Sequence, residues 1–206
     1  GDGLLHVKNY RDGMQVAATE IYFLDKKQDA SSYIKPNREF QVYALQQSRY
    51  MNGFWVGTGR TGLCYYSFDD GKLHEFSSQS AGAVRKLAEV HAIFEENDSV
   101  LYVATSGEGF SKIIVDRSRQ DMQIKSWKRY SFFHEQQELN LFYGMVAQGD
   151  SLLWLGSRQR GLVCFNRKTE EYQTYSLNEM LHKSVDDILS LHWHGEQLYV
   201  GTTSGL

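Results

Sequence analysis

One aromatic segment recurs along the chain, and this repeat constrains the fold more than any other feature. The central aromatic residues of its copies are Trp55, Tyr102, Trp154 and Tyr199, separated by 47, 52 and 45 residues. Such a period is too long for a leucine-rich or helical-pair repeat, so each copy must be a larger structural unit. The copies read FWVGTGRTGLCYY (54–66), LYVATSGEGFSKI (101–113), LWLGSRQRGLVCF (153–165) and LYVGTTSGL (198–206).

Alternating apolar residues and turn signals divide each unit into four short strands, here called A, B, C and D. Strand B is the aromatic segment, strand C begins at a recurrent glycine, and strand D carries aromatic residues three apart, as in Trp127 and Tyr130. The expected A strands cover 42–45, 90–94, 142–147 and 188–193, and a polar turn follows each. The recurrent glycines are Gly62, Gly109, Gly161 and Gly205, with Gly3 as a fifth copy.

A unit of four antiparallel strands cannot bury both of its faces alone, so neighbouring units must stack. We therefore expect an all-β chain of four-stranded β-propeller blades, forming a single segment over residues 1–206. The chain opens just before a C strand and stops just after a B strand, which gives about four blades in permuted order. Propellers close with about four to eight blades, so we expect part of a larger propeller. The expected units are approximately 1–40 (partial), 41–88, 89–140, 141–186 and 187–206 (partial).

Composition excludes several classes of protein. Hydrophobic residues make up 41% and charged residues 23% of the chain, as in an ordinary soluble domain. A net charge of −3 with scattered Lys and Arg predicts no nucleic-acid partner. No segment approaches the ~20 apolar residues of a membrane span, and no signal peptide is recognised, so the chain is either cytoplasmic or excised from something larger. Cys64 and Cys164 fall in core strands of different units, which predicts buried free thiols.

Several motifs have the letters of a functional site, but the repeat explains each of them. Residues 57–62 match a dinucleotide-binding fingerprint, yet a strand follows where that motif needs a helix, so they are read as a hairpin turn. His192 and His194 share one strand face without a third metal ligand. We therefore predict no catalytic residues, no metal site and no cofactor. The acidic pairs are interpreted as solvated residues at strand ends and turns: Asp69–Asp70, Glu95–Glu96 and Asp186–Asp187. The repeated Trp55 and Trp154 are interpreted as blade-packing residues.

Three copies of the unit resemble the two-component regulator propeller repeats found in the periplasmic sensor regions of hybrid histidine kinases, especially those of Bacteroides-type gut bacteria. That repeat reads Leu-Trp-Ile-Gly-Thr, then a short loop, then Gly-Leu. It is matched here by 54–58 with 62–63, by 153–157 with 161–162, and by 198–202 with 205–206. The remaining copy departs from the pattern, with Ala104 in place of glycine and Phe110 in place of leucine.

The resemblance implies a role in extracytoplasmic sensing. The segment would lie in the periplasm as part of an inner-membrane-anchored protein and bind a signal, which we expect to be an oligosaccharide. It would pass a change in blade or homodimer geometry to a histidine kinase elsewhere in the full protein, and would not itself be an enzyme. Its other partners would be the remaining blades of the parent chain. The alternatives are a propeller scaffold for protein–protein interaction and a propeller lyase or glycosidase.

Connectivity places the candidate ligand-binding residues on one face. Successive antiparallel strands reverse direction, so the B–C turns and the long D–A connections (77–88, 131–140 and 177–186) emerge together. Loops on a rigid scaffold commonly carry binding residues, and planar Arg groups suit sugars or carboxylates. The candidate ligand-binding residues in the B–C turns are Arg60, Glu108, Arg158, Gln159 and Arg160.

Overall fold

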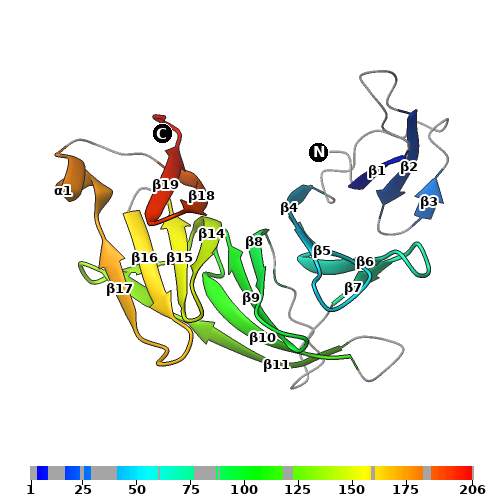
Figure 1. The fold of residues 1–206 in the computed structure, drawn as a ribbon, viewed down its shortest axis with the longest axis horizontal. Coiled ribbons are helices and arrows are strands. Elements are labelled where there is room, and N and C mark those ends of the chain that lie inside the picture. Colours follow the sequence, from blue (N-terminus) through cyan, green and yellow to red (C-terminus); the bar gives the residue numbers. More distant parts are fainter. Residues whose placement is uncertain are drawn as a thin grey trace.

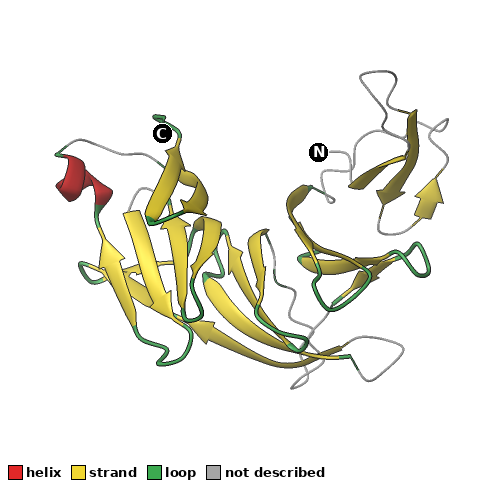
Figure 2. Cartoon of the chain, viewed as in Figure 1, coloured by secondary structure: helices red, strands yellow, loops and turns green. Residues whose placement is uncertain are grey.

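Strands make up most of the part of the chain that the structure describes. A computed structural model describes residues 4–8, 17–23, 26–28, 41–59, 61–76, 87, 89–117, 123–158, 161–182 and 187–205, the first three ranges as backbone only. Among these residues a single short helix stands beside the strands (Figure 2). All pairs of described strands are antiparallel, as predicted for the four-stranded units.

Three four-stranded sheets follow one another, each with its strands side by side in the order A, B, C, D. The predicted A strands and C-strand starts are confirmed. The first sheet is β4 (Val42–Gln47), β5 (Gly53–Thr58), β6 (Leu63–Ser67) and β7 (Leu73–Glu75). The second is β8 (Val90–Glu95), β9 (Val100–Thr105), β10 (Phe110–Asp116) and β11 (Gln123–Tyr130). The third is β14 (Phe142–Gln148), β15 (Leu152–Ser157), β16 (Gly161–Asn166) and β17 (Tyr172–Tyr175).

Smaller sheets lie on either side of these. β1 (Leu4–Lys8), β2 (Ala17–Phe23) and β3 (Lys26–Gln28) pair near the start of the chain. β18 (Ile188–His194) and β19 (Gln197–Thr202) supply the A and B strands of a further unit. The recurrent Gly3 lies outside the described residues.

Two of the long D–A connections contain secondary structure that was not predicted from the sequence. The connection after β11 forms the hairpin of β12 (Phe132–His134) and β13 (Gln137–Leu139). The connection after β17 forms the helix α1 (Leu177–Leu181). This helix starts where Ser176 Oγ accepts the Glu179 N–H, an N-cap bond that helical periodicity alone does not reveal in so short a segment. Most of the connection after β7 lies outside the described residues.

The A strands of successive sheets lie side by side: β4 beside β8, β8 beside β14, and β14 beside β18. Figure 1 shows these sheets fanned around an arc, with their A strands toward its inner side and strands such as β11 and β17 outside. The A strands are therefore where residues of different units meet.

The recurrent glycine closes every B–C turn in the same way. At the end of strand B a hydroxyl side chain donates to the carbonyl of that glycine, a bond that explains the Thr or Ser of the repeated motif. The pairs are Thr58 with Gly62 (3.0 Å), Thr105 with Gly109 (3.0 Å), Ser157 with Gly161 (2.8 Å) and Thr202 with Gly205 (2.8 Å). All of these glycines have positive φ, which favours glycine. The antiparallel pairing of β5 with β6 on either side of this closure is the hairpin predicted for 57–62, of which residue 60 lies outside the described residues.

The hydrophobic core lies between successive sheets. Trp55 anchors a cluster between the first and second sheets, and Tyr102 with Phe165 anchors another between the second and third. Trp55 and Tyr102 are fully buried, which confirms the packing role predicted for Trp55. Trp154 packs against Trp193 of the two-stranded β18–β19 sheet and is only half-buried.

The cysteines are free thiols, as predicted, but only Cys64 is buried. Cys164 is half-buried. It lies directly across from Trp154, on the face of the third sheet that packs against the two-stranded β18–β19 sheet. Partial burial raises the pKa of the Cys164 thiol.

One acidic residue was read wrongly from the sequence. Glu95, interpreted as a solvated strand-end residue, is completely buried between the first and second sheets. Its carboxylate accepts hydrogen bonds from Trp55 Nε1 (2.9 Å) and Ser48 Oγ (2.8 Å). Because these donors lie 40 and 47 residues away, the local turn pattern could not reveal them.

Candidate functional site

Each A strand carries a β-bulge at its second residue. In β4 the register shifts between Val42 and Ala44, and β8, β14 and β18 shift at the equivalent positions. A bulge leaves one residue out of the ladder and redirects its side chain, and bulges are frequent beside functional sites. The bulged residues are Tyr43, His91, Tyr143 and Leu189.

Three of the bulged side chains form a continuous aromatic row, defined here as Tyr43, His91 and Tyr143. The Tyr43 and His91 rings are stacked, with centroids 4.2 Å apart and an interplanar angle of 11°. Tyr143 meets the His91 ring at an angle of 65° and a centroid distance of 4.9 Å. Tyr43 is 40% exposed, whereas His91 and Tyr143 are half-buried. The row therefore crosses three sheets and is most accessible at Tyr43.

The backbone holds the B–C turns against the starts of the A strands. In four units the first turn residue donates its N–H to the carbonyl just before strand A: Gly59 to Gln41 (2.8 Å), Ser106 to Glu89 (3.0 Å), Arg158 to Leu141 (3.0 Å) and Thr203 to Asp187 (3.1 Å). Neighbouring units are joined at the same level, because Glu89 N–H donates to Gly59 O (2.5 Å). The aromatic row thus lies on a rigid frame of turns.

Polar groups border the aromatic row. The Tyr43 hydroxyl donates to Gln41 Oε1 at 2.5 Å. Burial, the Glu89 carboxylate and Tyr143 raise the pKa of Tyr43, which keeps its hydroxyl protonated. Neutral rings beside hydroxyl, amide and carboxylate groups suit a ligand with an apolar face and a hydroxylated rim.

His91 is expected to be neutral at pH 7. Burial lowers its pKa from 6.5, against the opposing effect of Glu89. A proton NMR titration should therefore give a His91 midpoint below 6.5, and the Tyr143→Ala variant should shift it upward by exposing the ring. Because the folded chain holds this proton less tightly than the unfolded chain, the His91 contribution to stability is present above pH 6.5 and decreases on acidification. A midpoint above 6.5 would contradict this assignment.

The structure describes two of the predicted ligand-binding residues, and they lie in different B–C turns. Glu108 is half-buried, and its N–H donates to Thr105 Oγ1 (3.0 Å). Arg158 is exposed, with Nε 3.4 Å from Asp187 Oδ2, an ion pair that leaves the guanidinium accessible. The others lie outside the described residues: Arg60, Gln159 and Arg160.

The aromatic row was not among the predicted ligand-binding residues, all of which lie in the B–C turns. Its signal was present in the sequence, since the second residue of the A strands reads Tyr, His, Tyr at positions 43, 91 and 143. Alternation alone assigns that residue to one side of a sheet, whereas the bulge directs it toward the neighbouring unit.

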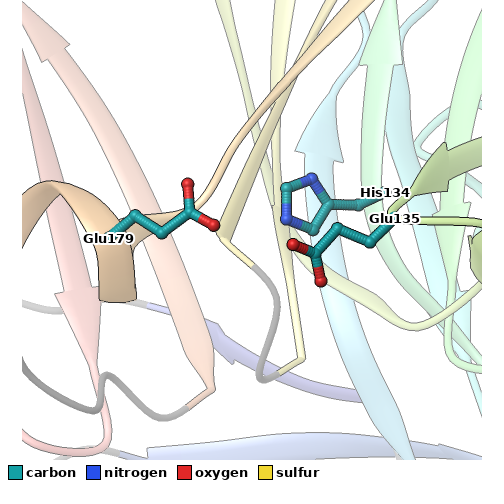
Figure 3. Close-up of side chains that lie close together, drawn as sticks. All are labelled: His134, Glu135 and Glu179. Atoms are coloured by element: carbon teal, nitrogen blue, oxygen red, sulfur yellow. The ribbon is translucent and has the colours of Figure 1, made fainter.

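The residues that could hold a metal are also different from those considered in the sequence. Among the described residues, the group with suitable geometry is His134, Glu135 and Glu179, and not His192 with His194. Their ligand atoms all lie within 4.8 Å of one another (Figure 3).

No helix among the described residues is long and apolar enough to cross a membrane.

Comparison with known proteins identifies the fold. No family model and no curated protein matches this sequence. The fold is similar to solved extracellular domains of bacterial signalling systems, which confirms the resemblance inferred from the repeat. One belongs to the hybrid two-component system BT3049 of Bacteroides thetaiotaomicron, with a TM-score of 0.63 and 13% identity over 90% of this chain and 24% of that one.

A second similar domain belongs to BT4673 of the same organism, with a TM-score of 0.59 and 18% identity over 81% of this chain and 23% of that one. The chain thus spans about a quarter of the length of these bacterial domains. The computationally designed protein Ika4 is also similar, with a TM-score of 0.51 and 11% identity over 82% of this chain and 90% of that one.

Proposed function

We propose that the chain is a β-propeller segment of the signal-binding region of a two-component sensor. In this proposal it lies in the periplasm, as part of a protein anchored in the inner membrane. The likeness to the Bacteroides thetaiotaomicron extracellular domains supports this role. The three four-stranded sheets with adjoining A strands support the propeller arrangement, in which A strands surround the axis.

The remaining blades of the parent propeller are the natural neighbours of the β18–β19 sheet. The aromatic residue of strand B is fully buried at Trp55 and Tyr102, where a complete sheet follows. The equivalent Tyr199 is 40% exposed. A further blade packed against β19 would bury this ring as the second sheet buries Trp55.

The proposed ligand is an oligosaccharide bound over the aromatic row. The observation that carries this proposal is the accessible stack of Tyr43 on His91, bordered by hydrogen-bonding groups. A sugar ring has an apolar face for the rings and hydroxyls for Gln41 and Glu89. The proposed role is binding without turnover, and the kinase that responds to the ligand lies elsewhere in the full protein.

The test is calorimetric titration of the chain, and of the parent extracytoplasmic region, with a panel of dietary and host glycans. For a glycan that binds, Tyr43→Ala and Tyr143→Ala should each weaken the affinity about tenfold, since truncating an aromatic anchor that the ligand covers costs more than about 1 kcal/mol. Tyr50→Ala is the matched control, because Tyr50 is 49% exposed but lies after β4, at the opposite end of the strand from Tyr43.

The outcomes separate the alternatives. Loss of affinity in Tyr43→Ala with normal affinity in Tyr50→Ala supports the aromatic row. Binding that neither row variant affects would place the glycan site elsewhere. Release of cleaved glycan during the titration would favour a lyase or glycosidase, and a panel in which no glycan binds the parent region would reject the oligosaccharide ligand.

A further inference from the structure

Three side chains with metal-ligating atoms converge from two separate D–A connections. His134 ends β12, Glu135 follows it in the hairpin turn, and Glu179 lies in α1. Figure 3 shows the Glu135 and Glu179 carboxylates facing the same ring nitrogen of His134. Because the three ligand atoms lie within 4.8 Å of one another, one ion can reach all of them after small rotations of the exposed glutamates.

The His134 ring is held in a ligating orientation by a residue outside this group. Its Nδ1 lies 3.1 Å from Thr174 Oγ1 in β17. With Nδ1–H donating to that oxygen, Nε2 presents its lone pair to the two carboxylates. Metal-ligating histidines are commonly fixed in this way, through a hydrogen bond from the nitrogen that does not bind the metal.

The convergence of two carboxylates calls for a positive charge. Like charges a few ångströms apart repel. A cation between two carboxylates attracts both of them, and these attractions outweigh the repulsion. The ion pairs formed among the described residues use other carboxylates, such as Glu138 and Glu170, and none involves Glu135 or Glu179.

We propose that His134, Glu135 and Glu179 bind a transition-metal dication, and that Zn²⁺ is the ion that best fits. One imidazole and two carboxylates are ligands that zinc accepts, whereas Mg²⁺ and Ca²⁺ prefer oxygen ligands alone. Three protein ligands leave a coordination position for water or a ligand group. The bound ion links the connection after the second sheet to the connection after the third. The site does not depend on the proposed oligosaccharide ligand.

The experiment is calorimetric titration of the intact chain with zinc chloride, with cobalt absorption as a second readout of coordination. One ion per chain is expected. His134→Ala and Glu179→Gln should each weaken zinc binding at least tenfold, and should remove the ligand-field absorption of cobalt. Thr174→Val should weaken binding about tenfold by releasing the imidazole, since second-shell partners contribute about 10- to 100-fold in affinity.

The control is the double variant His192→Ala/His194→Ala, which removes the exposed histidine pair of β18. It should bind zinc as the unchanged chain does, and magnesium chloride should not compete. The proposal is overturned if the unchanged chain binds no zinc, if His134→Ala and Glu179→Gln retain full affinity, or if the control loses binding. Glu179 is exposed, so Glu179→Gln tests the site even where His134→Ala fails to fold.

Discussion

Replacing Gly161 by alanine should destabilise the chain by about 3 kcal/mol or more, because two independent penalties coincide there. Gly161 has a φ of +93°, a conformation in which a side chain is strained. An added Cβ would also lie 2.0 Å from the Tyr175 carbonyl oxygen, so that β16 and β17 could no longer pair at their present spacing. Urea denaturation followed by tryptophan fluorescence measures the effect.

The matched control is Gly195→Ala in the β18–β19 turn. Gly195 has a similar left-handed conformation, with a φ of +58°, but an added Cβ meets nothing within 4 Å. It should cost about 1 to 2 kcal/mol, the penalty for the backbone conformation alone. Equal losses in the two variants would mean that close approach to Tyr175 plays no part in the repeat's preference for glycine.

The strands were predictable because their signals are local. Alternation, polar turns and the recurrent glycine all act within one unit, and they located the A strands and the C-strand starts to within two residues. Gly161 is an example. It adopts the left-handed conformation of the turn, and its missing side chain leaves room for the neighbouring strand. The recurrence of glycine at this position therefore marks both the turn and the strand pairing.

The aromatic row and the metal-ligating cluster were not predictable in the same way. Tyr43 and His91 lie 48 residues apart and become neighbours only when two sheets pack with bulged A strands side by side. His134 and Glu179 meet through a hairpin and a five-residue helix inside connections that were expected to be loops. Contacts between units depend on packing, which a pattern within one unit does not contain.

The buried carboxylate of Glu95 is the strongest case of such a contact, and replacing it by alanine should destabilise the chain by about 3 to 5 kcal/mol. Besides Trp55 and Ser48, the Arg49 N–H donates to Glu95 at 2.6 Å, and Arg117 Nη2 lies 3.0 Å from it. The other two Arg117 nitrogens have no partner among the described residues. Without Glu95, a largely buried guanidinium would therefore lose its counter-ion.

The control for this prediction is Glu138→Ala, which removes an exposed carboxylate paired with Arg129 at 2.8 Å. That change should cost less than about 1 kcal/mol, because solvent screens an exposed pair. Urea denaturation at pH 7 compares the two variants. A Glu95→Ala loss as small as that of Glu138→Ala would mean that the sheets do not depend on this carboxylate.

The pH dependence gives an independent check on Glu95. Burial alone would raise its pKa, but the hydrogen bonds from Trp55, Arg49, Ser48 and Arg117 outweigh burial and lower the pKa below its ordinary value. The folded chain therefore binds a proton at Glu95 less readily than the unfolded chain does. The stability that the ionised Glu95 contributes is present above the ordinary pKa of 4.5 and is lost as the pH falls through the lowered pKa of the folded chain. The stability difference between the unchanged chain and Glu95→Gln should accordingly be constant from pH 8 to pH 6 and decrease on further acidification. A difference that grows toward low pH would mean that Glu95 is protonated in the folded chain, and that the contact between the first two sheets is held by neutral hydrogen bonds.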